Sequence, residues 1–160
     1  MRSNEGTMGC LLIGETARMR TLKNRLDALG VSTLSLGQDG QQLSVAQEGL
    51  RAVRGPGGAC VAAEGELWAA ALALAVQLSV ERIVLIAPTD TFAGRRDEQR
   101  RQMERLKGYA RRNLFFCVSE VLVLEGAGDA RSERRIDQVC RRMCNARVHR
   151  AALSGEARQE

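Results

Sequence analysis

The stretch from Gly58 to Asp90 constrains the fold of this chain more than any other. It consists of an apolar run, a polar break at Glu64-Gly65-Glu66, an Ala- and Leu-rich segment from Leu67 to Leu78, and a second apolar run from Arg82 to Ala87. Ala and Leu are strong helix formers, and the Pro88 that follows can neither continue a helix nor donate to a sheet ladder. The pattern predicts a strand, a helix and a second strand, joined as a right-handed crossover between parallel strands.

The rest of the chain alternates in the same way. Its apolar runs are continuous, which is typical of strands buried on both faces. The predicted strands are Met8–Ile13, Val31–Leu36, Ala59–Ala63, Arg82–Ala87, Val121–Glu125 and Ala146–Leu153. The predicted helices are Ala17–Leu29, Ser44–Val53, Leu67–Leu78, Arg95–Arg112 and Ser132–Cys144. About six strands alternating with helices predict an α/β fold, with a three-layer, open, mostly parallel sheet and helices on both faces.

The first predicted helix carries clear end signals. Thr16 is placed to cap its N-terminus, and Gly30 follows its end as a C′ glycine does. Its apolar residues recur at helical intervals and are expected to face the core: Met19, Leu22, Leu26 and Leu29.

A length of 160 residues predicts a single domain, with flexible ends at residues 1–7 and 154–160. The longest apolar run, Leu67 to Val76, is shorter than the ~20 residues that a bilayer-spanning helix needs. The polar N-terminus lacks the apolar core of a secretion signal. We therefore expect a cytoplasmic protein that does not associate with membranes.

The five cysteines do not resemble a disulfide framework, because their number is odd and their spacing irregular. Cys10, Cys60 and Cys117 lie in apolar, strand-like runs, where a thiol behaves as a small hydrophobe. Cys140 and Cys144 lie four apart on a predicted helix, five residues before His149. That spacing fits either part of a metal site or one buried helix face. A structural zinc ion needs four ligands, so we expect neither a metal nor another cofactor.

The net charge of +5 is unevenly distributed, with −1 over residues 1–90 and +7 over residues 91–150. An excess of one sign can indicate an anionic partner. Within Arg95–Arg112, however, basic residues alternate with Asp97, Glu98 and Glu104 at helical spacings that favour ion pairs on a solvated face. Aromatic residues make up only 3% of the chain. The sequence therefore favours a small-molecule ligand or a protein partner over a nucleic acid.

Acidic residues follow most of the predicted strands. In a parallel sheet these positions meet at the carboxyl edge, where ligands of open α/β sheets bind. Carboxylates gathered there could hold a hard cation such as Mg²⁺, or could stabilise helix N-termini. The residues concerned are Glu15, Asp39, Glu64, Glu66, Asp90, Glu125 and Asp129.

The order and spacing of the elements resemble the α/β-hydrolase family from Met8 to about Leu153. In that family a strand ends in a Gly-x-Ser-x-Gly nucleophile elbow that opens a helix. Matching Ala71–Ala75 and Arg82–Pro88 to the family places Gly65 at the nucleophile position, between Ala63 and Leu67 at the two glycine positions. The run Val121–Asp129 resembles the strand and loop that bear the catalytic acid. The resemblance implies that Asp129 is that acid, although Asp in a glycine-rich turn is also a common turn former.

The chain departs from the family at the residues that perform the reaction. Gly65 offers no nucleophile, and no oxyanion loop follows Ile13-Gly14-Glu15. The family's histidine is expected near Glu156, yet the only histidine, His149, lies inside the last predicted strand. Acyl transfer needs both a nucleophile and a base.

Three functional hypotheses follow. The first is a non-catalytic α/β-hydrolase-like domain that binds a small ligand or a protein partner. The second is an esterase-like hydrolase with a rearranged carboxylate site. The third is a homo-oligomeric scaffold, in which the family's lid is reduced to the helix Arg95–Arg112. The expected ligand site comprises Glu15, Glu64, Gly65, Glu66 and Asp90, and the rearranged catalytic site comprises Glu64, Glu66 and Asp129.

Overall fold

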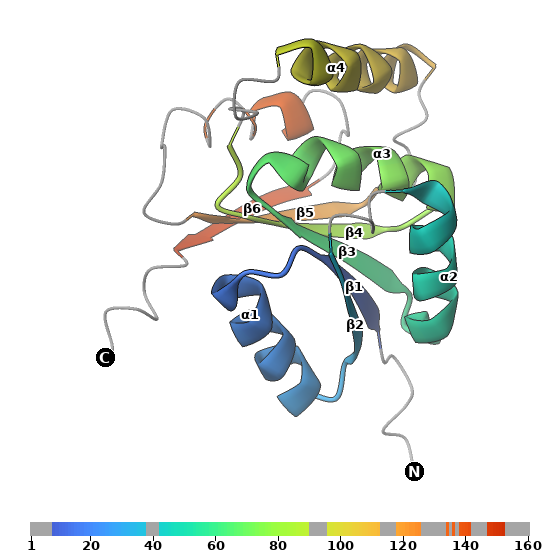
Figure 1. The fold of residues 1–160 in the computed structure, drawn as a ribbon, viewed down its shortest axis with the longest axis vertical. Helices are drawn as coiled ribbons and strands as arrows, with labels where there is room; N and C mark the ends of the chain where they lie inside the picture. The colour runs from blue at the N-terminus through green and yellow to red at the C-terminus, as the bar shows by residue number, and fades with distance from the viewer. Residues whose placement is uncertain are drawn as a thin grey trace.

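A computed structural model describes residues 8–37, 42–89, 96–112, 118–125, 134, 136, 138–141 and 147–152. Its centre is a six-stranded sheet in the order β2-β1-β3-β4-β5-β6, and every pair of neighbouring strands is parallel (Figure 1). The strands are β1 (Gly9–Ile13), β2 (Ser32–Leu36), β3 (Ala59–Glu64), β4 (Arg82–Ile86), β5 (Glu120–Glu125) and β6 (Arg147–Ala152). The predicted α/β class with an open parallel sheet is confirmed.

Helices connect the strands and complete three layers. They are α1 (Ala17–Ala28), α2 (Leu43–Val53), α3 (Trp68–Leu78) and α4 (Arg96–Arg111), with a short 3₁₀-helix η2 (Gly65–Leu67) between β3 and α3. The four α-helices lie within one residue of their predicted bounds, whereas η2 was not predicted. The predicted helix Ser132–Cys144 is described only in part, and residues 138–141 are helical. The predicted flexible ends, 1–7 and 154–160, lie outside the described residues.

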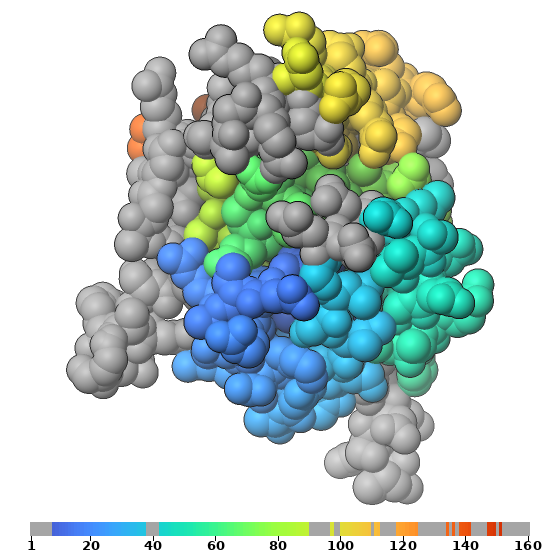
Figure 2. Space-filling view, in the orientation of Figure 1, coloured from blue at the N-terminus to red at the C-terminus, as the bar shows by residue number. Residues whose placement is uncertain are grey.

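The strand order decides which face of the sheet each helix covers. Crossovers between parallel strands are almost always right-handed. Only the step from β1 to β2 runs toward the β2 edge, whereas the later steps all run toward the β6 edge. The helix of the first step must therefore pack on the face opposite the others. Figure 1 shows α1 on one face of the sheet and α2, α3 and α4 on the other, and Figure 2 shows α1 (blue) and α4 (yellow to orange) at opposite ends of the visible surface.

The hydrophobic core is correspondingly unequal on the two faces. The larger cluster lies on the α2, α3 and α4 side and includes Leu11, Val61, Trp68 and Leu85. The smaller cluster lies under α1 and consists of Cys10, Leu12, Met19, Cys60, Ala62 and Ile86. Burying one large apolar side chain stabilises a fold by about 1.5–3 kcal/mol, so the α2–α4 side contributes most of the hydrophobic stabilisation.

Helix α1 follows most of its sequence signals. Thr16 is its N-cap, and its hydroxyl accepts a hydrogen bond from the backbone N–H of Met19 at 3.3 Å. Gly30 has φ +86°, as a C′ glycine should. The expectation that Leu29 faces the core is wrong, because its side chain is 77% exposed. The helix ends at Ala28, so Leu29, as the C-cap residue, no longer lies on the buried stripe.

Helix α4 is held by few apolar residues, as its sequence predicts. Leu106 is fully buried, and Met103 and Tyr109 pack against the larger cluster. Among the helices of the described residues, none combines the length and the apolar content needed to cross a membrane.

Gly9 generates a stability prediction. A Cβ at this position would lie 1.8 Å from the backbone oxygen of Val53, so β1 or the end of α2 would have to move. We expect Gly9→Ala to lower the free energy of unfolding by at least about 3 kcal/mol, the upper range for overpacking, as measured by guanidinium denaturation.

Gly108→Ala is the matched control. Gly108 lies in the interior of α4, and a Cβ added there meets nothing within 4 Å. It should be neutral or stabilising by up to about 1 kcal/mol. A Gly9→Ala protein with the unfolding midpoint of the wild type would contradict the close approach of β1 and α2.

Candidate functional site

The carboxyl ends of β1 and β3 form the switch point of the sheet. These strands are neighbours, and the chain leaves β1 toward β2 but leaves β3 toward β4. Ligands of open α/β sheets bind at such a point. Glu15 follows β1, while Glu64 ends β3 and Gly65 begins η2. The sheet therefore places these three predicted site residues at the same edge.

The backbone turns sharply where three strands reach this edge. Left-handed φ values occur at Gly14 (+128°) after β1, Gly65 (+63°) after β3 and Ala87 (+46°) after β4. Such a conformation in a non-glycine residue costs on the order of 1–3 kcal/mol and often occurs at functional sites. A Cβ at Gly65 would meet nothing within 4 Å. The strand-to-helix turn thus has the left-handed backbone for which glycine is best suited.

Glu64 is engaged in a structural network. One carboxylate oxygen accepts a hydrogen bond from the Thr16 hydroxyl, and the other forms an ion pair with Arg18 Nη1 at 3.4 Å. Thr16 and Arg18 lie at the N-terminal end of α1, where the helix dipole also favours a negative charge. Glu64 therefore joins the end of β3 to the start of α1. This agrees with the alternative that these carboxylates stabilise helix N-termini.

The other predicted carboxylates do not form one described cluster. The Glu15 carboxylate lies beside Gly37 at the end of β2, 3.1 Å from where a Cβ of that glycine would be. Glu66 is half-buried within η2. Asp39, Asp90, Asp129 and the side chain of Glu125 lie outside the described residues.

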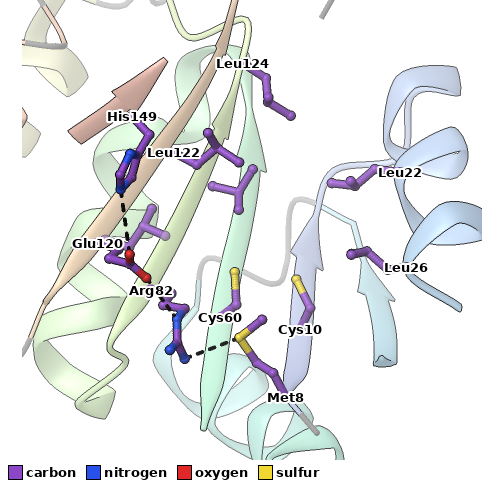
Figure 3. A pocket seen from close by; sticks show the side chains of 12 residues that line it. Met8, Cys10, Leu22, Leu26, Cys60, Arg82, Glu120, Leu122, Leu124 and His149 are labelled. Atoms are coloured by element: carbon purple, nitrogen blue, oxygen red, sulfur yellow. Dashed lines mark hydrogen bonds and ion pairs between the residues drawn. The ribbon is translucent and has the colours of Figure 1, made fainter. Parts of the chain in front are cut away.

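A cavity lies elsewhere, between α1 and the sheet. Figure 3 shows the side chains that line it. Its volume is about 450 Å³. Leu22 and Leu26 of α1 line one side of the cavity. Val84, Leu122 and Leu124 of the sheet line the other side. The remaining lining residues are Met8, Cys10, Cys60, Arg82, Ile83, Glu120 and His149. Sequence reasoning missed this cavity, because its lining comes from six separate elements, α1, β1, β3, β4, β5 and β6, whose adjacency depends on the strand order.

The strand order explains why the cavity is there. Right-handed connections place one crossover helix, α1, on this face, and α1 packs against β1 and β3. The same face of β4 and β5 remains incompletely covered by described residues, so that Val84, Leu122 and Leu124 are only partly buried. On the opposite face, Leu85 and Val123 are fully buried. The cavity thus follows from the topology of the sheet.

A row of polar side chains crosses the strands at one end of the cavity. Arg82 Nε lies 3.2 Å from Glu120 Oε1, and Glu120 Oε2 lies 3.6 Å from His149 Nε2. Arg82 Nη1 also donates to the backbone oxygen of Gly57 at 3.4 Å and to Met8 Sδ at 3.6 Å. These side chains are 39–51% exposed, so their ion pairs contribute little stability. They provide hydrogen-bond donors and acceptors beside an apolar volume.

Cys10 and Cys60 lie on the sheet side of the cavity. They are paired in register on adjacent strands, and both are buried as thiols. Two effects raise the pKa of the Cys60 thiol well above its usual value. The larger is a hydrogen bond with Cys10, and the second is burial. The sequence predicted two buried thiols but could not predict that they are neighbours.

The residues of the suggested partial metal site do not come together. Cys140 is buried in the larger cluster on the α2–α4 side, whereas His149 lines the cavity on the other face. Cys144 lies outside the described residues. Within the part of the chain that the structure describes, no group of three or more His, Cys, Asp and Glu side chains is arranged to hold a metal ion.

The chain matches no protein-family model, and no curated protein is similar to it at a significant level.

Proposed function

We propose that this chain is a non-catalytic α/β-hydrolase-like domain that binds a small, largely apolar molecule in the cavity beneath α1. The observation that carries the proposal is the cavity itself. Its volume of about 450 Å³ lies within the ~300–1,000 Å³ typical of small-molecule sites. Such sites are mostly apolar and contain a few polar groups that orient the ligand.

The lining suggests the chemistry of the ligand. Leu22, Leu26, Val84, Leu122 and Leu124 would contact an apolar body from two sides. The Arg82–Glu120–His149 row would bind one polar end, such as a carboxylate, hydroxyl or amide, because the row offers both donors and acceptors. The scarcity of aromatic residues in the chain favours an aliphatic ligand over one recognised by ring stacking.

The absence of acyl-transfer chemistry is supported by the positions of Gly65 and His149. His149 on β6 is paired with Leu122 on β5, Leu122 with Val84 on β4, and Val84 with Ala62 on β3. Three strand spacings of about 4.8 Å therefore separate it from β3, or about 14 Å across the sheet. A general base must lie within about 3 Å of the proton it removes. A nucleophile introduced at Gly65 would lie far from His149.

The rival hypothesis, a hydrolase with a rearranged carboxylate site, receives less support from the described residues. It places the reaction on Glu64, Glu66 and Asp129, and Asp129 lies outside the described residues. Both carboxylate oxygens of Glu64 are engaged by Thr16 and Arg18. We therefore favour the binding function.

The ligand proposal is tested by filling the cavity. Leu122→Trp places a larger side chain on the cavity wall, so it should exclude the ligand. A thermal-shift screen of aliphatic compounds with one polar end should yield ligands that raise the Tm of the wild type, since binding at 100 times Kd stabilises the folded state by about 2.7 kcal/mol. The same ligands should leave the Tm of Leu122→Trp unchanged.

Leu43→Trp is the matched control, since Leu43 is an exposed residue of α2 on the opposite face of the sheet. Its protein should respond to ligands as the wild type does. The proposal is wrong if no such compound stabilises the wild type, or if the stabilising compounds act equally on Leu122→Trp.

The non-catalytic part of the proposal has a separate test. Because no serine stands at Gly65 and no histidine stands within reach of it, a fluorophosphonate probe should not label the folded protein. Labelling is measured by intact-protein mass spectrometry, with a heat-denatured sample as the control for non-specific reaction. Stoichiometric labelling that is lost on denaturation would overturn this part of the proposal.

A further inference from the structure

Three sulfur-bearing side chains share the cavity wall. Cys10 on β1 and Cys60 on β3 are directly paired across the sheet, and both side chains line the same cavity. Figure 3 shows their sulfur atoms on the same side of the sheet. Met8 also lines the cavity. Since it precedes Cys10 by two residues on an extended chain, it lies on the same face.

The spacing of the two cysteines disfavours a disulfide. Neighbouring parallel strands lie about 4.8 Å apart, and side chains at paired positions leave the sheet side by side. Their Cβ atoms are therefore separated by roughly that distance, beyond the ~3.5–4.5 Å of a disulfide. A bound ion tolerates a wider spacing, because two metal–sulfur bonds of about 2.3 Å, the zinc–thiolate length, allow the two sulfur atoms to lie up to about 4.6 Å apart. A disulfide requires them to lie about 2 Å apart.

We propose that Cys10 and Cys60 bind one Cu(I) ion, with the Met8 thioether as a third ligand. Thiolate and thioether sulfur are soft ligands that favour Cu(I). A structural zinc site would require four ligands, usually from Cys, His or carboxylates, and the described residues offer no such group here. The Met8 sulfur accepts a hydrogen bond from Arg82 Nη1 at 3.6 Å. The three rotatable bonds of the Met8 side chain allow its sulfur to leave Arg82 and turn toward the ion.

Binding changes no oxidation state. Cu(I) displaces one proton from each thiol, the two protons pass to solvent, and the ion forms a bond to each sulfur. The chemistry of the site fits the ion, because the surrounding wall of Leu12, Met19 and Ala62 keeps water from the two sulfurs. Low water access protects Cu(I) from hydration and oxidation, and both thiols are at most 3% exposed.

The test is an anaerobic competition between the reduced full chain and the Cu(I) chelator bicinchoninate, followed by the absorbance of the chelator complex. The reference protein carries Cys117→Ala and Cys144→Ala, so that Cys140 is the one cysteine left besides the pair. We expect it to take up one Cu(I) per chain. Cys10→Ala and Cys60→Ala should each weaken Cu(I) binding by more than about 100-fold. Loss of a residue that only supports a metal ligand already costs up to about 100-fold in affinity, and loss of the ligand itself should cost more.

Cys140→Ala is the matched control, because Cys140 is equally buried but lies on the opposite face of the sheet. It should bind Cu(I) as the reference protein does.

Met8→Leu keeps the apolar volume and removes the sulfur, so it should weaken Cu(I) binding by about tenfold. Circular dichroism checks that each variant is folded. If an alanine variant does not fold, Cys10→Ser or Cys60→Ser is used in its place.

No uptake of Cu(I) by the reference protein would overturn the proposal, and so would uptake that survives both Cys10 and Cys60 substitutions. The proposal is independent of the small-ligand function, because it needs the two thiols and not the aliphatic walls. Leu122→Trp should therefore abolish ligand stabilisation while Cu(I) uptake remains. Failure of one proposal can thus be distinguished from failure of the other.

Discussion

The right-handedness of parallel crossovers is the constraint on which this structure depends. With strands in the order β2-β1-β3-β4-β5-β6, it places α1 on one face and α2, α3 and α4 on the other. The second face consequently gains a continuous apolar core. The first face has one crossover helix, which packs against the β1 side of the sheet and leaves a cavity over β4 and β5.

Two regions with different roles result from this arrangement. At the carboxyl edge, sharp turns and the Thr16–Glu64–Arg18 contacts tie β3 to the start of α1. That network joins the end of β3 to α1, the helix that forms one wall of the cavity. The cavity combines aliphatic walls, a polar row and a pair of thiols.

The local elements could be predicted from the sequence because their signals are local. Continuous apolar runs, the Thr16 cap and Gly30 all depend on neighbouring residues, and the structure has them where the pattern places them. Leu29 shows the limit of periodicity, since a helical repeat does not reveal that the helix ends one residue earlier. The cavity, the Cys10–Cys60 pair and the Arg82–Glu120–His149 row could not be predicted, because each depends on which strands are neighbours.

The most direct measurement of the central claim is a crystal structure of the protein pressurised with xenon, an atom that enters apolar cavities. We expect xenon between α1 and the sheet, in contact with Leu22, Leu26 and Leu122. Its density should be absent at the same place in Leu122→Trp. A wild-type crystal in which α1 packs directly on Val84 and Leu122 and leaves no room for xenon would contradict the claim that the strand order leaves a cavity on this face.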